Sequence, residues 1–273
     1  MLIDTHCHLD AAEFSEDRPA VIQRAQEQGV KAIVIPAVSR SNFGTVRDLA
    51  HSFRGGAYAL GIHPICIPQA QASDLEVLES TIVQAMDDPR LVAIGEIGLD
   101  FFLPQLKEPA VRDKQEVFYA AQLDLAQRYG LPVLLHVRRS QDILLKHLRR
   151  RGAIGGIAHA FNGSFQQAGQ FLDHGFALGF GGAMTFTRAL QIRRLAEQLP
   201  LEALVLETDA PDIPPAWLGG PGQATARNEP GEVAGVATEM AGIRGLARAD
   251  LIKVTAANAR RVLPRLGLAA MNG

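Results

Sequence analysis

The segment from 111 to 136 reads VRDKQEVFYAAQLDLAQRYGLPVLLH and contains one complete helix–strand repeat. Apolar side chains recur at helical spacing over Val111–Tyr129, which predicts a helix with one apolar face. Gly130 can close that helix in a left-handed conformation. The run Pro132–His136 that follows lacks polar alternation, as expected of a parallel strand covered on both faces. This unit predicts an α/β protein with a parallel sheet.

The same unit recurs along the 273 residues. The other apolar runs expected to be strands are Leu2–Asp4, Lys31–Pro36, Ala57–Gly61, Leu91–Gly95, Gly155–His159, Phe176–Gly179 and Leu204–Glu207. Helix-to-strand links are short and strand-to-helix links are long, so the long loops gather at one end. Eight repeats in one domain over 1–273 predict a TIM (β/α)8 barrel, with Asp212–Gly231 as a loop over its mouth. An open doubly wound sheet is the alternative, but it would usually have fewer repeats.

Composition excludes several other classes of protein. Apolar residues make up 47% and charged residues 21%, which is not the composition of a disordered chain. Two cysteines, Cys7 and Cys66, do not make a disulfide framework. The formal charge of -2 gives no basic footprint, so a polyanion site would have to be a local patch. Without a signal peptide or a long apolar run at the sequence level, we expect a soluble, cytoplasmic monomer with no membrane partner.

Metal-ligating side chains stand where the predicted strands end. Residues two apart in an extended segment point the same way, so His6 and His8 face one side and Cys7 the other, toward the helix layer. The carboxyl ends of barrel strands form the active-site face. A lone His-X-His pair could be a surface pair, but buried carboxylates near four histidines need a cation. The six candidates are His6, His8, Glu96, His136, His159 and Asp209.

Two metal ions fit this set better than one. Six protein ligands would saturate a single ion and leave no position for water or substrate. Glu96 is the natural bridge, because a carboxylate has two oxygens whereas an imidazole offers one lone pair. Mixed imidazole and carboxylate ligands suit Zn, Mn, Fe or Ni and tolerate Mg less well.

Five motifs together resemble the TatD family of metal-dependent deoxyribonucleases. They are His6-Cys7-His8, Gly61-Ile62-His63-Pro64, Gly95-Glu96-Ile97-Gly98-Leu99-Asp100, the strand-end His136 and His159, and Glu207-Thr208-Asp209-Ala210-Pro211. Asn228-Glu229-Pro230 and the Phe101-Phe102 pair resemble variants within that family. The resemblance implies an amidohydrolase-like TIM barrel with two divalent ions (Zn, Mn or Mg) and phosphodiester hydrolysis.

The resemblance also implies roles for individual residues. His6, His8, Glu96 and Asp209 would hold one metal, and Glu96, His136 and His159 the other. His63 lacks an obvious ligand partner in the sequence, and the family pattern implies that it contacts the scissile phosphate; its alternative is a buried histidine fixed by Pro64.

Several further residues have two interpretations each. Arg138 and Arg227 could meet a phosphate or remain solvated. Asp100 could orient a ligand histidine or cap the loop after it, and Glu207 could be an inward-facing acid behind Asp209. The glycine run 179–182 could cradle phosphate, although glycine-rich turns are common. The helical histidines are expected at the surface; they are His51, His147 and His174.

The leading hypothesis is a two-metal phosphodiesterase, an exonuclease acting on DNA ends or single strands, with Asp209 as general base. Glu96 would bridge the metals, and His63 and an arginine would offset charge on the phosphate. A second hypothesis is hydrolysis of an ester or amide, such as an aminoacyl-tRNA ester. A third is a non-catalytic barrel that binds metal or a partner.

Overall fold

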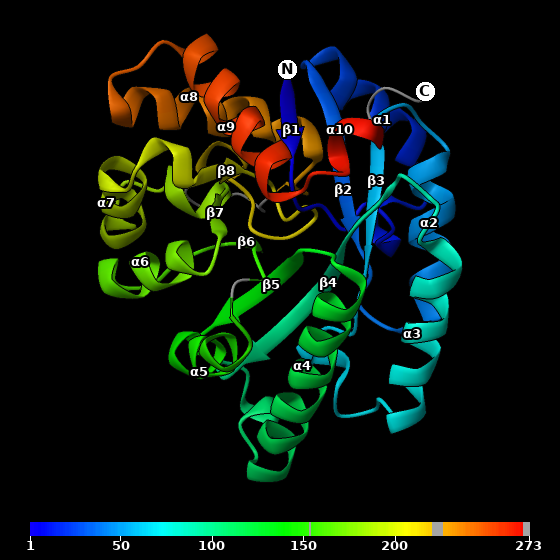
Figure 1. Ribbon diagram of the computed structural model, residues 1–273. Helices are drawn as coiled ribbons and strands as arrows, with labels where there is room; N and C mark the ends of the chain where they lie inside the picture. The colour runs from blue at the N-terminus through cyan, green and yellow to red at the C-terminus, as the bar shows by residue number, and fades with distance from the viewer. Residues whose placement is uncertain (153, 220–225, 270–273) are drawn as a thin grey trace.

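The computed structural model describes residues 1–152, 154–219 and 226–269. Eight parallel strands follow one another in chain order and are surrounded by helices (Figure 1), so the TIM barrel prediction is confirmed. The strands are β1 Leu2–Asp4, β2 Val30–Pro36, β3 Gly56–Leu60, β4 Leu91–Asp100, β5 Val133–Arg138, β6 Gly156–Ala158, β7 Phe176–Phe180 and β8 Leu204–Leu206. The helices are α1 Arg18–Glu27, α2 Phe43–His51, α3 Ala72–Ala85, α4 Pro109–Tyr129, α5 Gln141–Arg151, α6 Phe165–Asp173, α7 Leu190–Gln198, α8 Val233–Arg244, α9 Arg248–Val262 and α10 Leu266–Ala269.

The barrel closes between β1 and β8 through backbone hydrogen bonds beyond the strand ends. The Thr5 N–H donates to the Leu206 carbonyl at 3.1 Å. The Asp209 N–H donates to the His6 carbonyl at 2.9 Å, and the His8 N–H donates to the Ala210 carbonyl at 2.8 Å. Closure therefore fixes the first and last chemical motifs of the chain side by side.

Strand β4 is longer than the sequence analysis predicted. It continues through Glu96 to Asp100, because Ile97–Asp100 pairs residue by residue with Leu135–Arg138 of β5. The glycines in this stretch obscured the strand in the sequence. The pairing places Asp100 beside Arg138 at the barrel mouth.

The barrel interior and the layer between strands and helices form two separate cores. Small side chains such as Ala32, Ala59 and Ala177 line the interior with branched aliphatic residues, and α9 and α10 complete that cluster. Helix α9 contacts β1, β7 and β8 (Figure 1), and the Asn258 side chain donates to the Leu204 carbonyl, where β8 begins. The amino-terminal end of the barrel is thus covered by a helix.

The outer core lies under the helices. Cys7 belongs to it, as predicted from its alternation with His6 and His8. His147 on α5 was expected at the surface, but it is only 7% exposed. Its ring packs against Tyr119 of α4, and its Nε2 lies 3.0 Å from the Glu116 carboxylate. Within the described residues, no helix is both long and apolar enough to cross a membrane.

Candidate metal centre

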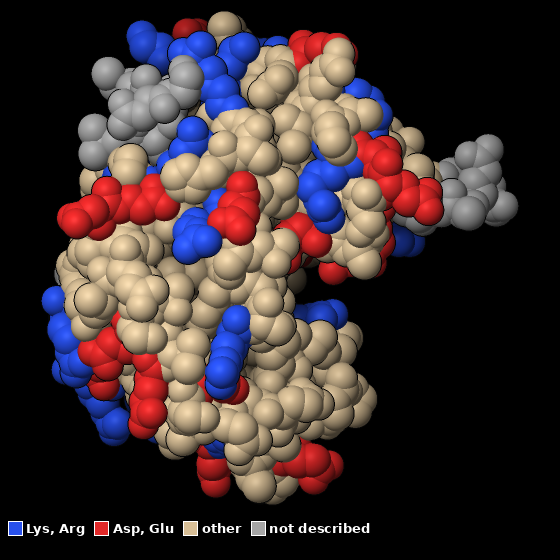
Figure 2. Space-filling model, turned by 90° about the vertical axis from the view of Figure 1, so that its right-hand side faces the viewer, with Lys and Arg blue, Asp and Glu red and all other residues tan. Residues whose placement is uncertain are grey.

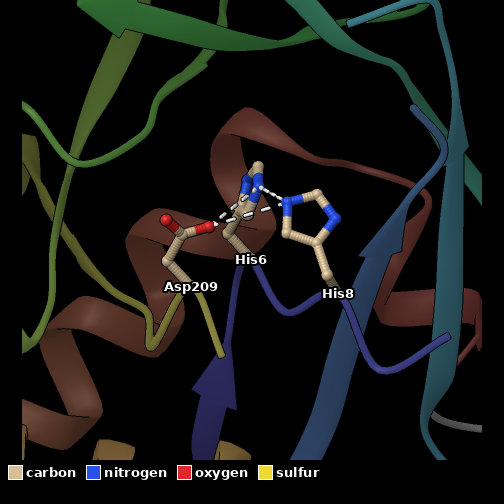
Figure 3. Close-up of side chains that lie close together, drawn as sticks. All are labelled: His6, His8 and Asp209. Carbon is tan, nitrogen blue, oxygen red and sulfur yellow. Dashed lines mark hydrogen bonds and ion pairs between the residues drawn. The ribbon is translucent and has the colours of Figure 1, made fainter. Parts of the chain in front are cut away.

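All six predicted ligands lie together at the carboxyl ends of the strands. His6 and His8 follow β1, Glu96 and His136 lie within β4 and β5, and His159 and Asp209 follow β6 and β8. Figure 3 shows His6, His8 and Asp209 converging, with the Asp209 carboxylate aimed at both imidazoles. Parallel strands bring these residues together because all their carboxyl ends meet at one rim.

One oxygen of the Glu96 carboxylate faces the first group of ligands. Its Oε2 lies 3.1 Å from Nε2 of His6 and 3.3 Å from Nε2 of His8. The same two nitrogens lie 3.6 Å and 3.7 Å from Oδ1 of Asp209. This group has the four residues expected for one metal.

The other oxygen of Glu96 faces a second group. Its Oε1 lies 2.9 Å from Nδ1 of His136 and 2.9 Å from Nε2 of His159. His63 joins this group, with its Nε2 3.4 Å from Oε1 of Glu96 and 3.0 Å from Nδ1 of His136. The sequence analysis found no ligand partner for His63, and the structure places its imidazole beside Glu96 and His136, at the edge of this group.

The distances between the imidazole nitrogens match those between ligand atoms that share one metal ion. Nε2 of His6 and Nε2 of His8 are 3.3 Å apart, and Nδ1 of His136 and Nε2 of His159 are 3.4 Å apart. Donor atoms about 2.1 Å from a shared tetrahedral ion would be separated by roughly this distance. Three clusters within the described chain have their ligand atoms mutually within 4.8 Å, and Glu96 belongs to two of them. The donor set therefore suits a binuclear site.

The charges of the buried groups are set by one another. Burial would raise the pKa of Glu96, but the surrounding histidines hold it well below its usual range. Burial would lower the pKa of His8, but Glu96 and Asp209 outweigh that effect and raise it to about 9. Burial and the neighbouring His159 lower the pKa of His6 to about 3. Burial raises the pKa of Asp209 to about 6. Protons on the histidines whose pKa is raised, such as His8 and His159, therefore supply positive charge near Glu96.

Metal binding is consequently expected to release protons. His8 has a pKa of about 9, so at pH 7 it carries a proton that it must lose before it can ligate. The apparent metal affinity should rise with pH as His8 loses its proton, and also as His159 does, because Glu96 and Asp209 raise the pKa of His159 well above its usual range. Calorimetric titration with Mn or Zn at pH 7 in buffers of different ionisation enthalpy should show release of protons. Identical heats in all buffers would contradict this charge distribution.

Asp4 orients the first and last ligand segments, and the sequence analysis missed it. Its Oδ1 accepts hydrogen bonds from the backbone N–H groups of His6 (3.3 Å) and Thr208 (3.0 Å), and its Oδ2 accepts one from the Thr208 hydroxyl (2.6 Å). Burial raises the pKa of Asp4 to about 8. The sequence feature that could have identified Asp4 is its position two residues before His6, on the same side of an extended segment.

Two glutamines of α4 hold the mouth segments of β3 and β4. The Gln122 side chain accepts from the Ile62 N–H at 2.7 Å and donates to the Ile62 carbonyl at 3.2 Å, which fixes the backbone beside His63. The Gln115 side chain accepts from the Asp100 N–H at 2.9 Å. Both glutamines are fully buried. The spacing of apolar residues along the helix does not predict that these two glutamines are buried, because they are polar.

Asp100 performs both functions that the sequence left open. Its Oδ2 lies 3.3 Å from Nε2 of His136, so it can orient that imidazole. Its Oδ1 accepts hydrogen bonds from the backbone N–H groups of Phe102 and Leu103, which caps the following loop. These bonds outweigh burial and lower the pKa of Asp100 to about 2.

Glu207 lies behind His159 and is enclosed by Gly179. Its Oε1 accepts from the Ala160 N–H at 2.5 Å and lies 3.7 Å from Nδ1 of His159. A Cβ at Gly179 would lie 2.0 Å from Oε2 of Glu207. The glycine therefore provides the space for this carboxylate, and the close packing accounts for one glycine of the 179–182 run.

Gly179→Ala is expected to destabilise the protein by about 1–3 kcal/mol, because the methyl group would overlap a buried carboxylate. Urea unfolding would measure the loss. Gly44→Ala is the matched control, since a Cβ at Gly44 of α2 meets no heavy atom within 4 Å and alanine favours the helix. Equal stability of the two variants would contradict the packing argument.

The two candidate arginines have different surroundings. Arg138 lies at the end of β5 with its Nη1 3.8 Å from Oδ2 of Asp100. Both terminal nitrogens of Arg227 bond to the Asp17 carboxylate, and Nη2 also bonds to Glu229. Arg138 is therefore freer to meet a substrate. Part of the predicted mouth loop 212–231, residues 220–225, lies outside the described residues.

The TatD-related DNase family matches residues 3–264. The chain belongs to this family. A relative in Escherichia coli strain K12, the uncharacterized metal-dependent hydrolase YjjV, is 42% identical over 215 residues, which cover 78% of this chain and 80% of that protein. Human deoxyribonuclease TATDN3 is 32% identical over 272 residues, which cover 97% of this chain and 95% of that protein. These matches make the chain a TatD-family metal-dependent hydrolase.

One solved structure supports the TatD-family assignment, and a second shows the shared fold. The crystal structure of the TatD homolog YjjV from E. coli has a TM-score of 0.87 and 36% identity, and the match covers 96% of this chain and 98% of that one. A TatD-family hydrolase from Entamoeba histolytica has a TM-score of 0.81 at 22% identity over 96% of this chain and 97% of that one, which shows the shared fold.

Proposed function

We propose that this protein is a two-metal phosphodiesterase that cleaves DNA at ends or in single strands. The observation that carries the proposal is that the two carboxylate oxygens of Glu96 face different histidines. Its Oε2 faces His6 and His8. Its Oε1 faces His136, His159 and His63. A carboxylate shared in this way is suited to bridging two ions. The name of the family and of the human relative supports DNA as the substrate.

Two divalent ions, Zn, Mn or Mg, would be held in two sets that share Glu96. The first set is His6, His8, Glu96 and Asp209, and the second is Glu96, His136 and His159. When bound, such ions lower the pKa of water and neutralise charge on phosphate oxygens. Asp209 is the general base in this proposal. The Asp209 side chain is 13% exposed whereas that of Glu96 is 1% exposed, so Asp209 is the more accessible of the two carboxylates to a substrate. Carboxylates commonly serve as general bases in such reactions.

Phosphate recognition falls to His63 and Arg138. His63 stands at the rim, partly exposed, and Arg138 carries a fixed positive charge two residues beyond His136. Figure 2 shows basic and acidic side chains close together beside a notch in the right-hand edge of the molecule. With a formal charge of only -2 and mixed surface charge, polyanion binding must rest on such local groups. Arg227 is the weaker candidate, because its ion pairs with Asp17 and Glu229 would have to open.

His63→Ala is expected to leave metal affinity nearly unchanged and to slow phosphodiester cleavage on the order of 100-fold, the effect of removing one donor to developing charge. Metal titration and turnover should be measured on the same preparations. His51→Ala on α2 is the matched control, since His51 is exposed and contacts Asp88. Loss of one metal equivalent would make His63 a ligand, and unchanged turnover would make it a packed histidine.

One experiment tests the proposal directly. The metal-reconstituted protein is offered end-labelled single-stranded DNA, a small phosphodiester and an aminoacyl-tRNA in parallel. Cleavage of DNA and the small diester, abolished by chelation, supports the proposal, and the label position gives the polarity. Cleavage of the aminoacyl ester alone would instead select the ester or amide hydrolase. No cleavage of any substrate with both metals bound would favour a non-catalytic barrel.

A further inference from the structure

The two adjacent phenylalanines after β4 have opposite environments. Phe101 is buried, with the Arg112 guanidinium 4.2 Å from its ring centroid. Phe102 is 38% exposed, and two guanidinium carbons lie over its ring, that of Arg138 at 4.0 Å and that of Arg139 at 4.7 Å from the centroid. We call Phe102, Arg138 and Arg139 the Phe102 platform. An exposed ring held by two cations is a different environment from that of a scattered surface apolar residue.

Hydrogen bonds hold the backbone on both sides of the platform. The Phe102 N–H donates to Oδ1 of Asp100 at 2.7 Å. On the β5 side, Arg139 has a φ of 56°, and the hydroxyl of the next residue, Ser140, donates to the Leu99 carbonyl at 2.6 Å. A rigid aromatic ring loses little conformational entropy when it binds a ligand.

The platform also adjoins the metal centre. Oδ2 of Asp100 lies 3.3 Å from Nε2 of His136 and 3.8 Å from Nη1 of Arg138. The carboxyl group that caps the Phe102 loop is therefore the one that contacts a candidate metal ligand. A group bound on the platform would lie beside a phosphate bound at that centre.

We propose that the Phe102 platform binds one unpaired nucleobase flanking the scissile phosphate. The exposed part of the ring and the guanidinium groups beside it offer a surface on which a base can stack, and the two positive charges match the adjoining phosphates. Every base has such a face, so the platform selects single-stranded over paired nucleic acid without reading the base sequence. This inference deepens the proposed function and rests on it for the position of the scissile phosphate.

The test is equilibrium binding by the metal-loaded protein. The probes are a fluorescein-labelled thymidine 12-mer with hydrolysis-resistant phosphorothioate linkages and a strand of equal length in which abasic sites replace the bases. Phe102→Ala should weaken binding of the thymidine strand by about 5- to 150-fold, the usual range for one stacked base, and leave the abasic strand unchanged. Phe102→Trp should restore binding of the thymidine strand.

Two controls separate stacking from charge and from folding. Phe53→Ala and Arg54→Ala alter the same residue types in the link between α2 and β3, at the opposite end of the barrel. Both should bind like the parent protein. Arg138→Ala with Arg139→Ala should weaken both strands and reduce the salt dependence. Equal losses on both strands with Phe102→Ala, or no loss on either, would overturn the base platform.

Failure of this inference can be told apart from failure of the proposed function. If the protein cleaves DNA but Phe102→Ala binds both strands normally, the platform is wrong and the phosphodiesterase stands. If Phe102→Ala selectively loses the thymidine strand but the parent protein cleaves no DNA, the platform stands as a nucleobase site and the proposed reaction is wrong.

Discussion

Glu96→Gln is expected to reduce the metal content from two ions per chain to at most one. The amide keeps the shape of the side chain, but its nitrogen cannot ligate, and one of the two groups around Glu96 loses its oxygen. Replacing a residue that merely contacts a ligand commonly costs 10–100-fold in metal affinity or activity. Replacing a ligand that two ions share should reduce metal affinity and activity further, so we expect turnover to fall by more than about a hundredfold.

Elemental analysis and turnover on one preparation would check both effects. Glu79→Gln is the matched control: Glu79 lies on α3, is partly exposed and pairs with Arg128. Its replacement should change neither the metal content nor the turnover. Retention of two ions with normal turnover in Glu96→Gln would contradict the bridging role. An anomalous map of the reconstituted parent protein should show two ions about 3.5–4 Å apart, a typical two-metal spacing.

Asp209→Asn is expected to lower turnover by about 10²–10⁴-fold with the fold intact, since asparagine keeps the shape but cannot accept the proton. Asp209 also faces the nitrogens of His6 and His8, so the affinity of that group for metal should fall as well. Turnover should therefore be measured at saturating metal, where occupancy is verified. This condition isolates the loss of the base.

The control for Asp209 is Asp48→Asn, an exposed carboxylate on α2 that pairs with Arg47. It should behave like the parent protein. Near-normal turnover of Asp209→Asn at full occupancy would place the base elsewhere. A large loss at full occupancy, with circular dichroism unchanged, would support Asp209.

The candidate ligands at the strand ends could be predicted from the sequence, because the carboxyl ends of all barrel strands lie on one face. Apolar runs that end in His136 or His159 place those side chains at one rim, whatever the details of packing. The alternation of His6, Cys7 and His8 likewise determines which side chain enters the core. Local periodicity therefore predicted both the barrel and the residues that converge at its mouth.

Interactions between distant segments could not be read in this way. Asp4 holds the backbone of Thr208, and Gln122 holds that of Ile62, through contacts that depend on barrel closure and on the rotation of α4. The burial of His147 depends on how α5 packs against α4. Such contacts depend on the folded structure, because the sequence does not show which distant group a polar side chain will meet.

The sequence by itself determined the repeat, the barrel and the identity of the convergent histidines and acids, because each depends on residue type and period. Only the tertiary structure decided how the two oxygens of Glu96 face different imidazoles and that His63 lies beside the second group. It also decided that Phe102 is exposed beside two arginines while Phe101 is buried. The physical reason is that these properties depend on side-chain direction and on distances of a few ångströms between separate strands. Backbone pairing and helix packing set those distances, and neither is visible in a linear chain.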